Sequence, residues 1–249
     1  MKIILSPAKK MRVETDTLPP LTVPVYLDRA EEILAWLRGL SDGELKRLWA
    51  CSDKIASVNA RRIREADLRA PLQTPAVLAY DGIAYQYMAP AVFEDGQYEY
   101  VQEHLRILSG FYGVLKPMDG VVPYRLEMQA KARIGGGKDL YAYWGSALYE
   151  EVARDGEDLI VDLASKEYSD CITRYLTPGV RCVTCVFGEL SGGRVIQKGV
   201  YAKMARGEMV RFMAEKGIED PEELKGFDRL GYRFSEERSE ADTLVFLKE

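Results

Sequence analysis

Short apolar segments that run into hydroxyl and cationic side chains constrain the fold of this chain most. The segments span residues 2–5, 159–164 and 195–201, and the side chains that follow them are Ser6, Lys9, Ser165, Lys166, Lys203 and Arg206. Each segment reads as a strand, and open sheets bind ligands beyond the carboxyl ends of their strands. If the three strands end at one edge, their hydroxyls and fixed charges meet there, and we expect a site for a phosphate group. The alternative is that the serines cap helices and the lysines lie scattered over the surface.

Strands and helices follow one another without the strict rhythm of a βαβ protein. Predicted strands lie at residues 2–5, 77–80, 159–164, 180–190, 194–201, 231–234 and 243–247. The segment Ser191-Gly192-Gly193 indicates a hairpin, so at least one pair of strands is antiparallel. We therefore predict an α+β fold in which a mixed sheet is surrounded by helices. No linker or repeat divides the chain, which favours one domain over residues 1–249.

A possible phosphate-binding turn lies among the first helices. These helices are predicted over residues 26–38, 41–55 and 60–66. Residues 57–59 loosely fit the tight turn of a helix-hairpin-helix element, whose backbone N–H groups bind a DNA phosphate. Asn59 can adopt the left-handed conformation that such a turn needs, and Arg61 and Arg62 follow it directly. An ordinary helical corner with a solvated basic face is the alternative.

The middle of the chain predicts a helix and then an ordered loop. Residues 98–108 favour a helix that carries the only histidine, His104. Residues 109–128 contain several glycines and prolines but stay apolar throughout, which indicates an ordered loop with short strands. Within it, Arg125 and Glu127 alternate onto one face of a short strand, where they can form an ion pair or belong to a site.

Composition limits the partners that the chain can have. It has 249 residues, 47% of them hydrophobic, and a formal net charge of −5. A weakly acidic chain is no general binder of polyanions, so nucleic acid has to be bound through a local basic patch. No apolar run reaches the roughly 20 residues of a membrane helix, and no signal peptide is evident. We therefore expect a cytoplasmic protein with no membrane partner, whose four cysteines are reduced thiols.

The same cationic side chains allow a second function, which is catalysis on a nucleotide, a base or damaged DNA. A lysine with a depressed pKa can form a Schiff base with a sugar carbon, as in bifunctional DNA glycosylases. The candidates are Lys9, Lys166 and Lys203, with Asp81 or Asp162 as carboxylate partners. A single histidine and the lack of ligand spacing argue against a metal site, so we expect no metal and no cofactor and rank direct iron sequestration low.

Separated blocks of sequence occur in one order along nearly the whole chain. They are Leu5-Ser6-Pro7-Ala8-Lys9, residues 104–110, residues 112–117, residues 123–128, residues 137–141, Trp144-Gly145, Leu163-Ala164-Ser165 with Glu167-Tyr168, Tyr201-Ala202-Lys203 with Ala205-Arg206-Gly207, Gly226-Phe227 and Gly231-Tyr232. Together they resemble the YaaA family of bacterial peroxide-stress resistance proteins.

This resemblance carries expectations of its own. It implies a cytoplasmic protein that limits oxidative damage to DNA during hydrogen peroxide stress and is linked to lower free intracellular iron. It also implies sequence-nonspecific binding of duplex or branched DNA, through a positively charged cleft and a helix-hairpin-helix-like element, on a fold largely peculiar to the family. It brings no settled enzymatic reaction. DNA binding is thus the first hypothesis, with a lysine-based enzyme in the same cleft as the alternative.

Overall fold

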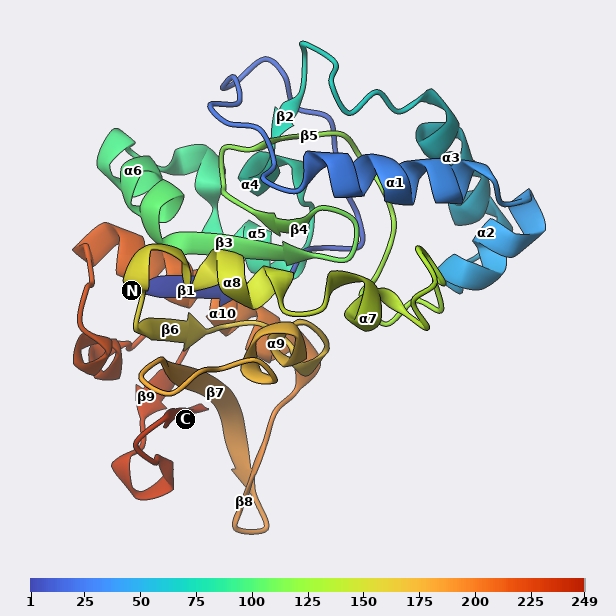
Figure 1. Ribbon diagram of the computed structural model, residues 1–249. Helices are drawn as coiled ribbons and strands as arrows, with labels where there is room; N and C mark the ends of the chain where they lie inside the picture. Colours follow the sequence, from blue (N-terminus) through green and yellow to red (C-terminus); the bar gives the residue numbers. More distant parts are fainter. Residues whose placement is uncertain (249) are drawn as a thin grey trace.

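A mixed β-sheet forms the centre of the molecule. The computed structural model describes residues 1–248, and within them the strands form one eight-stranded sheet and one two-stranded sheet (Figure 1). The large sheet has the order β4-β3-β1-β6-β7-β10-β9, and β8 pairs with β7 outside this path. The strands are β1 (Lys2–Leu5), β2 (Thr74–Pro75), β3 (Leu105–Ser109), β4 (Gly113–Leu115), β5 (Gly120–Val121), β6 (Leu159–Asp162), β7 (Arg181–Ser191), β8 (Arg194–Ile196), β9 (Tyr232–Phe234) and β10 (Thr243–Lys248).

The five central strands of the large sheet, β3, β1, β6, β7 and β10, run parallel. The strands β4, β8 and β9 are antiparallel to their neighbours, so the predicted mixed sheet is confirmed. Parallel strands are buried on both faces and read as continuous apolar runs, as the buried β1 does. Because β1 lies between β3 and β6 and in register with both, the segments that leave β1 and β6 begin side by side.

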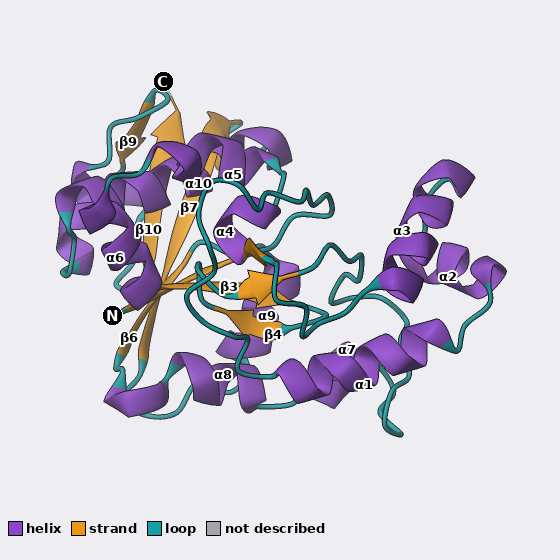
Figure 2. Cartoon of the chain, turned by 90° about the horizontal axis from the view of Figure 1, so that it is seen from above, coloured by secondary structure: helices purple, strands orange, loops and turns teal. Residues whose placement is uncertain are grey.

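Helices surround this sheet. They are α1 (Leu27–Arg38), α2 (Asp42–Trp49), α3 (Asp53–Glu65), α4 (Ala76–Ala79), α5 (Ile83–Met88), α6 (Asp95–His104), α7 (Leu140–Trp144), α8 (Ala147–Val152), α9 (Lys166–Thr173) and α10 (Gly199–Lys216), with short 3-10 helices η1 (Pro90–Val92), η2 (Arg154–Gly156), η3 (Pro221–Gly226) and η4 (Glu236–Arg238). Figure 2 shows α5, α6 and α10 on one face of the sheet and α8 on the other, while α2 and α3 extend away at one end. The α+β fold with helices around the sheet is therefore confirmed. No helix within residues 1–248 is both long and apolar enough to cross a membrane.

The turn predicted at residues 57–59 is wrong, because α3 runs through it without a break. Asn59 is buried, and its side-chain amide donates to the carbonyl of Ile55, one helical turn earlier, at 2.8 Å. Ala56, Asn59, Ala60 and Ile63 form one buried stripe at helical spacing, and packing of this stripe keeps the segment helical. The helix-hairpin-helix-like element is consequently not confirmed.

One other predicted element is wrong, and a second is confirmed only in part; the residues that differ are short, buried segments. Residues 77–80 were expected as a strand, but Ala76–Ala79 form α4. The helix expected over residues 98–108 ends at His104, and Leu105–Ser109 form β3 next to β1. A short, fully buried apolar segment has no polar face, so its periodicity cannot separate a strand from a helix.

Candidate functional site

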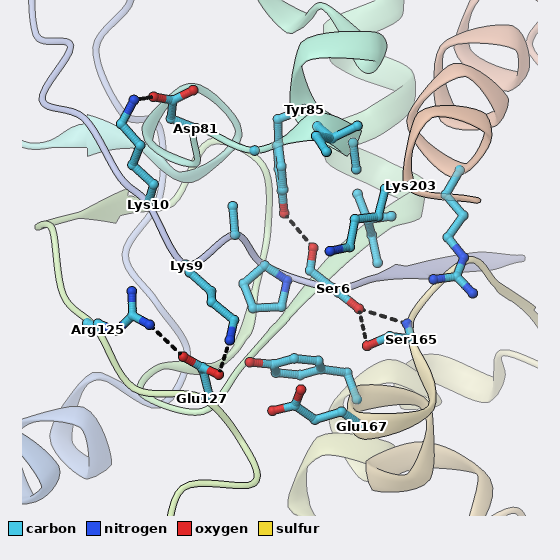
Figure 3. A pocket seen from close by; sticks show the side chains of 18 of the residues that line it. Ser6, Lys9, Lys10, Asp81, Tyr85, Arg125, Glu127, Ser165, Glu167 and Lys203 are labelled. Carbon is cyan, nitrogen blue, oxygen red and sulfur yellow. Dashed lines mark hydrogen bonds and ion pairs between the residues drawn. The ribbon is translucent and has the colours of Figure 1, made fainter. Parts of the chain in front are cut away.

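A pocket of about 340 Å³ lies at the carboxyl edge of the parallel strands. Its wall combines the segments that leave β1 and β6, the loop at 124–127, the first turns of α5 and α9 and the second turn of α10 (Figure 3). Its charged side chains are the cations Lys9, Lys10, Arg125, Lys203 and Arg206 and the acids Asp81, Glu127 and Glu167. This is the edge at which open α/β sheets bind ligands.

Two serines join the segments that leave β1 and β6. The hydroxyl of Ser6 donates to the hydroxyl of Ser165 at 3.1 Å, and the backbone N–H of Ser165 donates to the Ser6 hydroxyl at 2.8 Å. The phenol of Tyr85, on α5, donates to the Ser6 carbonyl at 3.0 Å. The Ser6 hydroxyl therefore donates its proton to Ser165 and has none left for a ligand. The proton of the Ser165 hydroxyl has no acceptor among the described residues and can be donated to a ligand.

Two cations from α10 reach the pocket without an acidic partner. Lys203 and Arg206 lie one helical turn apart, and neither makes an ion pair within residues 1–248. Burial lowers the pKa of the Arg206 guanidinium, and the charge of Asp162 opposes this shift. The buried Nε of Arg206 has no hydrogen-bond partner in the described part of the chain. A buried guanidinium with unused donors is suited to bind an anion.

The route by which Lys203 and Arg206 reach the site differs from the predicted one. The sequence predicted a strand up to residue 201, followed by these cations. Instead β8 ends at Ile196, and α10 begins at Gly199. The structure thus brings Ser6, Lys9, Ser165, Lys203 and Arg206 into one pocket, although the last two come from a helix.

The opposite side of the pocket carries two carboxylates, one of which is paired with two cations. Glu127 accepts from Lys9, with Nζ and Oε2 at 2.5 Å, and from Arg125, with Nη2 and Oε1 at 3.1 Å. The predicted Arg125–Glu127 ion pair is thus confirmed, and Lys9 is neutralised by the same carboxylate. Glu167 accepts a hydrogen bond from the backbone N–H of Gln129 at 3.1 Å. Burial raises the pKa of Glu167, and the negative charge of Glu127 adds to this effect.

The two aspartates predicted as carboxylate partners have different positions. Asp81 lines the pocket and is paired with Lys10, which lowers the pKa of the Asp81 carboxyl. Asp162 lies outside the lining and is 3% exposed. It accepts from the backbone N–H of Ala164 at 2.8 Å and from the hydroxyl of Ser169, and burial raises its pKa. Asp162 therefore does not line the pocket, but its negative charge opposes the lowering of the Arg206 pKa by burial.

Besides Asp162, four predicted site residues lie outside the pocket lining: Asn59, Arg61, Arg62 and Lys166. Lys166 is the first residue of α9, has an 87% exposed side chain and pairs with Asp170 at 2.8 Å. Arg61 is exposed, and Arg62 donates to the carbonyl of Met11 at 3.4 Å. The sequence located these cations near a strand end or a helical corner, but their direction depends on which helix face is buried.

Other lining residues were missed as site residues by the sequence analysis, above all Tyr85, Glu167 and Tyr168. Glu167 follows Ser165 by two positions at the start of α9, and this spacing was the one available signal. Tyr168 shares this signal, because it follows Glu167 in α9, whereas Tyr85 has none, because α5 is brought to the pocket by packing. Within residues 1–248, no group of three or more histidine, cysteine, aspartate or glutamate side chains has an arrangement that could hold a metal ion.

Comparison with known proteins agrees with the resemblance noted in the sequence. A family model described as peroxide stress protein YaaA matches residues 1–238. A UPF0246 protein of Agathobacter rectalis is 60% identical over 246 residues, which cover 99% of this chain and 98% of that protein. UPF0246 proteins of Desulfitobacterium hafniense and Lachnoclostridium phytofermentans are each 55% identical over 248 residues, which cover 100% of this chain and 98% and 96% of those proteins. The chain therefore belongs to the YaaA family of peroxide stress proteins.

Proposed function

We propose that this chain binds DNA, without sequence preference, across the face that carries the pocket, and thereby limits oxidative damage to DNA during peroxide stress. The observation that carries the proposal is the position of Lys203 and Arg206, which enter the pocket beside Ser165 without an acidic partner among the described residues. Phosphate contacts from lysine, arginine and hydroxyl groups supply most sequence-independent affinity for DNA.

The size of the pocket and the charge of the chain restrict how DNA would bind. A volume of about 340 Å³ is at the lower end of the range for small-molecule sites, ~300–1,000 Å³, so a duplex cannot enter it. The backbone of the DNA would lie across the mouth of the pocket. Because the formal net charge is −5, the rest of the surface offers little general attraction to a polyanion.

The test is titration of a fluorescently labelled duplex and of a branched DNA with the wild-type protein and three variants. Lys203→Gln and Arg206→Gln should each weaken binding of either DNA by about tenfold, since each removes a phosphate contact. Lys216→Gln is the matched control, because Lys216 ends the same helix, roughly 20 Å from Lys203 at a rise of ~1.5 Å per residue. Equal affinities for wild type, Lys203→Gln and Arg206→Gln would contradict this interface.

A second function is favoured by the amine of Lys203, which lines the pocket without an ion-pair partner in residues 1–248. Of the three candidate nucleophiles, Lys9 pairs with Glu127 and Lys166 pairs with Asp170. The Lys203 amine would add to the C1′ aldehyde of an abasic site, water would leave, and an imine would form. Borohydride would reduce this imine to a stable amine, so a protein–DNA adduct that Lys203→Gln abolishes is the expected result. No adduct on abasic or oxidised DNA would remove this function.

The lower free iron expected from the family is a separate question. If the chain acted on iron directly, it would have to bind the ion with defined stoichiometry. Anaerobic equilibrium dialysis against ferrous iron measures this, and tight stoichiometric binding would favour sequestration over DNA binding as the protective activity.

A further inference from the structure

The pocket has two ends of opposite character. In Figure 3, Lys203 lies on one side of the Ser6–Ser165 pair, and Glu127 and Glu167 lie on the other. The charges that shift the pKa values of the lining residues also differ between the two ends. The pKa of Glu167 responds to Glu127 and Lys9, whereas that of Arg206 responds to Asp162. A ligand that fills the pocket would thus meet two unpaired cations at one end. At the other end it would meet Glu167 and a Glu127 carboxylate that Lys9 and Arg125 already neutralise.

The cationic end offers donors in the pattern that a phosphate group accepts. Arg206 supplies a planar guanidinium and Lys203 supplies an ammonium, and both side chains line the pocket without an ion-pair partner in residues 1–248. The Ser165 hydroxyl adds a third donor, because its own proton is unused among the described residues. Guanidinium, ammonium and hydroxyl donors converging from two elements are a common arrangement around phosphate oxygens.

Much of the remaining wall is apolar. Pro7, Ile83, Ala84 and Leu126 line it, together with Tyr168, the residue that follows Glu167. Small-molecule sites combine such walls with a few placed polar groups that fix orientation. An apolar wall between a phosphate site and a carboxylate suits a flat, uncharged ring of intermediate size.

The acidic end has one carboxylate oxygen available. Glu167 uses Oε1 to accept from the Gln129 N–H, whereas Oε2 has no hydrogen-bond donor within the described chain. Because Oε2 has no donor of its own and Glu167 lines the pocket, a ligand that places an N–H group beside this oxygen would be favoured. Glu127 is already satisfied by Lys9 and Arg125, and Glu167 is therefore the group that would select the ligand.

We propose that the pocket holds one nucleoside monophosphate unit, with its phosphate on Lys203 and Arg206 and the amino group of its base on Glu167. This inference deepens the proposed DNA binding and rests on it. The unit is either a free nucleotide or a single nucleotide extruded from DNA, as enzymes that act on bases require. Guanine, adenine and cytosine carry an amino group, whereas thymine presents carbonyl oxygens in its place. With thymine, a carbonyl oxygen of the base would face the Glu167 carboxylate oxygen, which would have no hydrogen-bond donor.

The first arm of the test uses free nucleotides and calorimetry. The 5′-monophosphates dGMP, dAMP and dCMP should bind at least about tenfold more tightly than dTMP, because a site that lacks its donor rejects the analogue. Arg206→Gln should weaken all four nucleotides together. Glu167→Gln should close the gap between dGMP and dTMP, since glutamine offers an N–H donor that thymine can accept. Lys216→Gln should change nothing.

The second arm uses a duplex that contains one 2-aminopurine, an amino-bearing base whose fluorescence is quenched by stacking. A rise in fluorescence on binding, lost in Glu167→Leu while duplex affinity persists, would identify an extruded unit of DNA as the occupant, because leucine offers no acceptor to the amino group. Free-nucleotide binding with the stated selectivity would identify the free ligand. If the duplex binds in a manner that depends on Lys203 but neither signal occurs, the pocket assignment is overturned and DNA binding stands. If neither duplex nor nucleotide binds, both are overturned.

Discussion

At the scale of single residues, three acids near the carboxyl edge of the sheet experience different surroundings. Lys10 lowers the pKa of Asp81, so this carboxylate is ionised and neutralised within the protein. Burial raises the pKa of Asp162, although Ser169 and Ala164 hydrogen-bond to it. Burial and Glu127 raise the pKa of Glu167. Ionised Glu167 is therefore a charge that the folded chain tolerates at a cost, which is typical of groups retained for binding.

This cost predicts a pH-dependent effect of Glu167→Gln on stability. The folded-state pKa of Glu167 lies above the unfolded-state value of about 4.3. The folded chain binds the proton more tightly, so the free energy of unfolding falls as the pH rises between the two pKa values. We expect Glu167→Gln to raise Tm at pH 7.5, with the gain shrinking towards zero below about pH 4. Thermal unfolding across this range measures it.

A suitable control is Glu99→Gln, which changes an exposed glutamate on α6. It should leave Tm nearly unchanged at both pH values. A Glu167→Gln variant that is equally destabilised at every pH would show that the carboxylate stabilises the pocket and carries no cost.

The cysteines of this peroxide stress protein predict a second result at the residue scale. Burial raises the pKa of Cys171 and of Cys182 to about 12 and also raises that of Cys185. Peroxide reacts with the thiolate, which is scarce at neutral pH in all three. We expect these thiols to stay reduced in native protein treated with peroxide and to oxidise once urea unfolds the chain, as measured by alkylation and mass spectrometry. Sulfenic acid at any of the three in native protein would contradict this.

At the scale of elements, the position of Lys203 and Arg206 depends on how closely α10 approaches α5. Gly207 follows Arg206 directly, and a Cβ at this position would lie 1.9 Å from the carbonyl oxygen of Ala84 on α5. Backbone cannot yield as a side chain does, so glycine is required for this contact. The same contact sets the distance between α10 and the wall formed by Ile83 and Ala84.

Gly207→Ala is therefore expected to destabilise the protein by about 1–3 kcal/mol, because the helices must separate to admit the methyl group. DNA binding should weaken in parallel, since Lys203 and Arg206 move with α10. The matched control is Gly96→Ala in α6, where an added Cβ meets nothing within 4 Å. That change should be neutral or stabilise by up to ~1 kcal/mol. Urea unfolding of the two variants gives the comparison, and equal stabilities would show that α5 and α10 adjust freely.

The elements also show how far the sequence could predict this site. The exits of β1 and β6 were predictable, because apolar runs that end in a serine mark buried parallel strands and their ligand-binding edge. The start of α10 was not, since Val200 and Tyr201 extend the apolar pattern of the hairpin although they belong to a helix. The turn at residues 57–59 failed for a related reason: burial of Asn59 in α3 overrode its local preference. Local patterns located strands, whereas helix packing decided which cations enter the pocket.

At the scale of the whole molecule, the charge that matters is local. The chain has a formal net charge of −5, yet five cationic and three acidic residues line the pocket. The sheet order places β1 beside β6, and the connection through β7 and β8 returns the chain to this edge at α10. An acidic molecule thereby has a local excess of cationic residues at this edge, which supports the proposed DNA binding.

The proposed DNA binding through this face predicts a small salt dependence of the affinity, part of which can be attributed to Lys203 and Arg206. Each phosphate that the protein neutralises contributes about −0.9 to the slope of log Kobs against log salt concentration. Lys203→Gln and Arg206→Gln should each reduce the magnitude of this slope by about one, and the double variant by about two. Lys216→Gln should keep the wild-type slope, because its charge lies at the far end of α10. Anisotropy titrations between low and physiological salt measure these slopes. A double variant that binds more weakly with an unchanged slope would mean that Lys203 and Arg206 hold the pocket together and that the phosphates are contacted elsewhere.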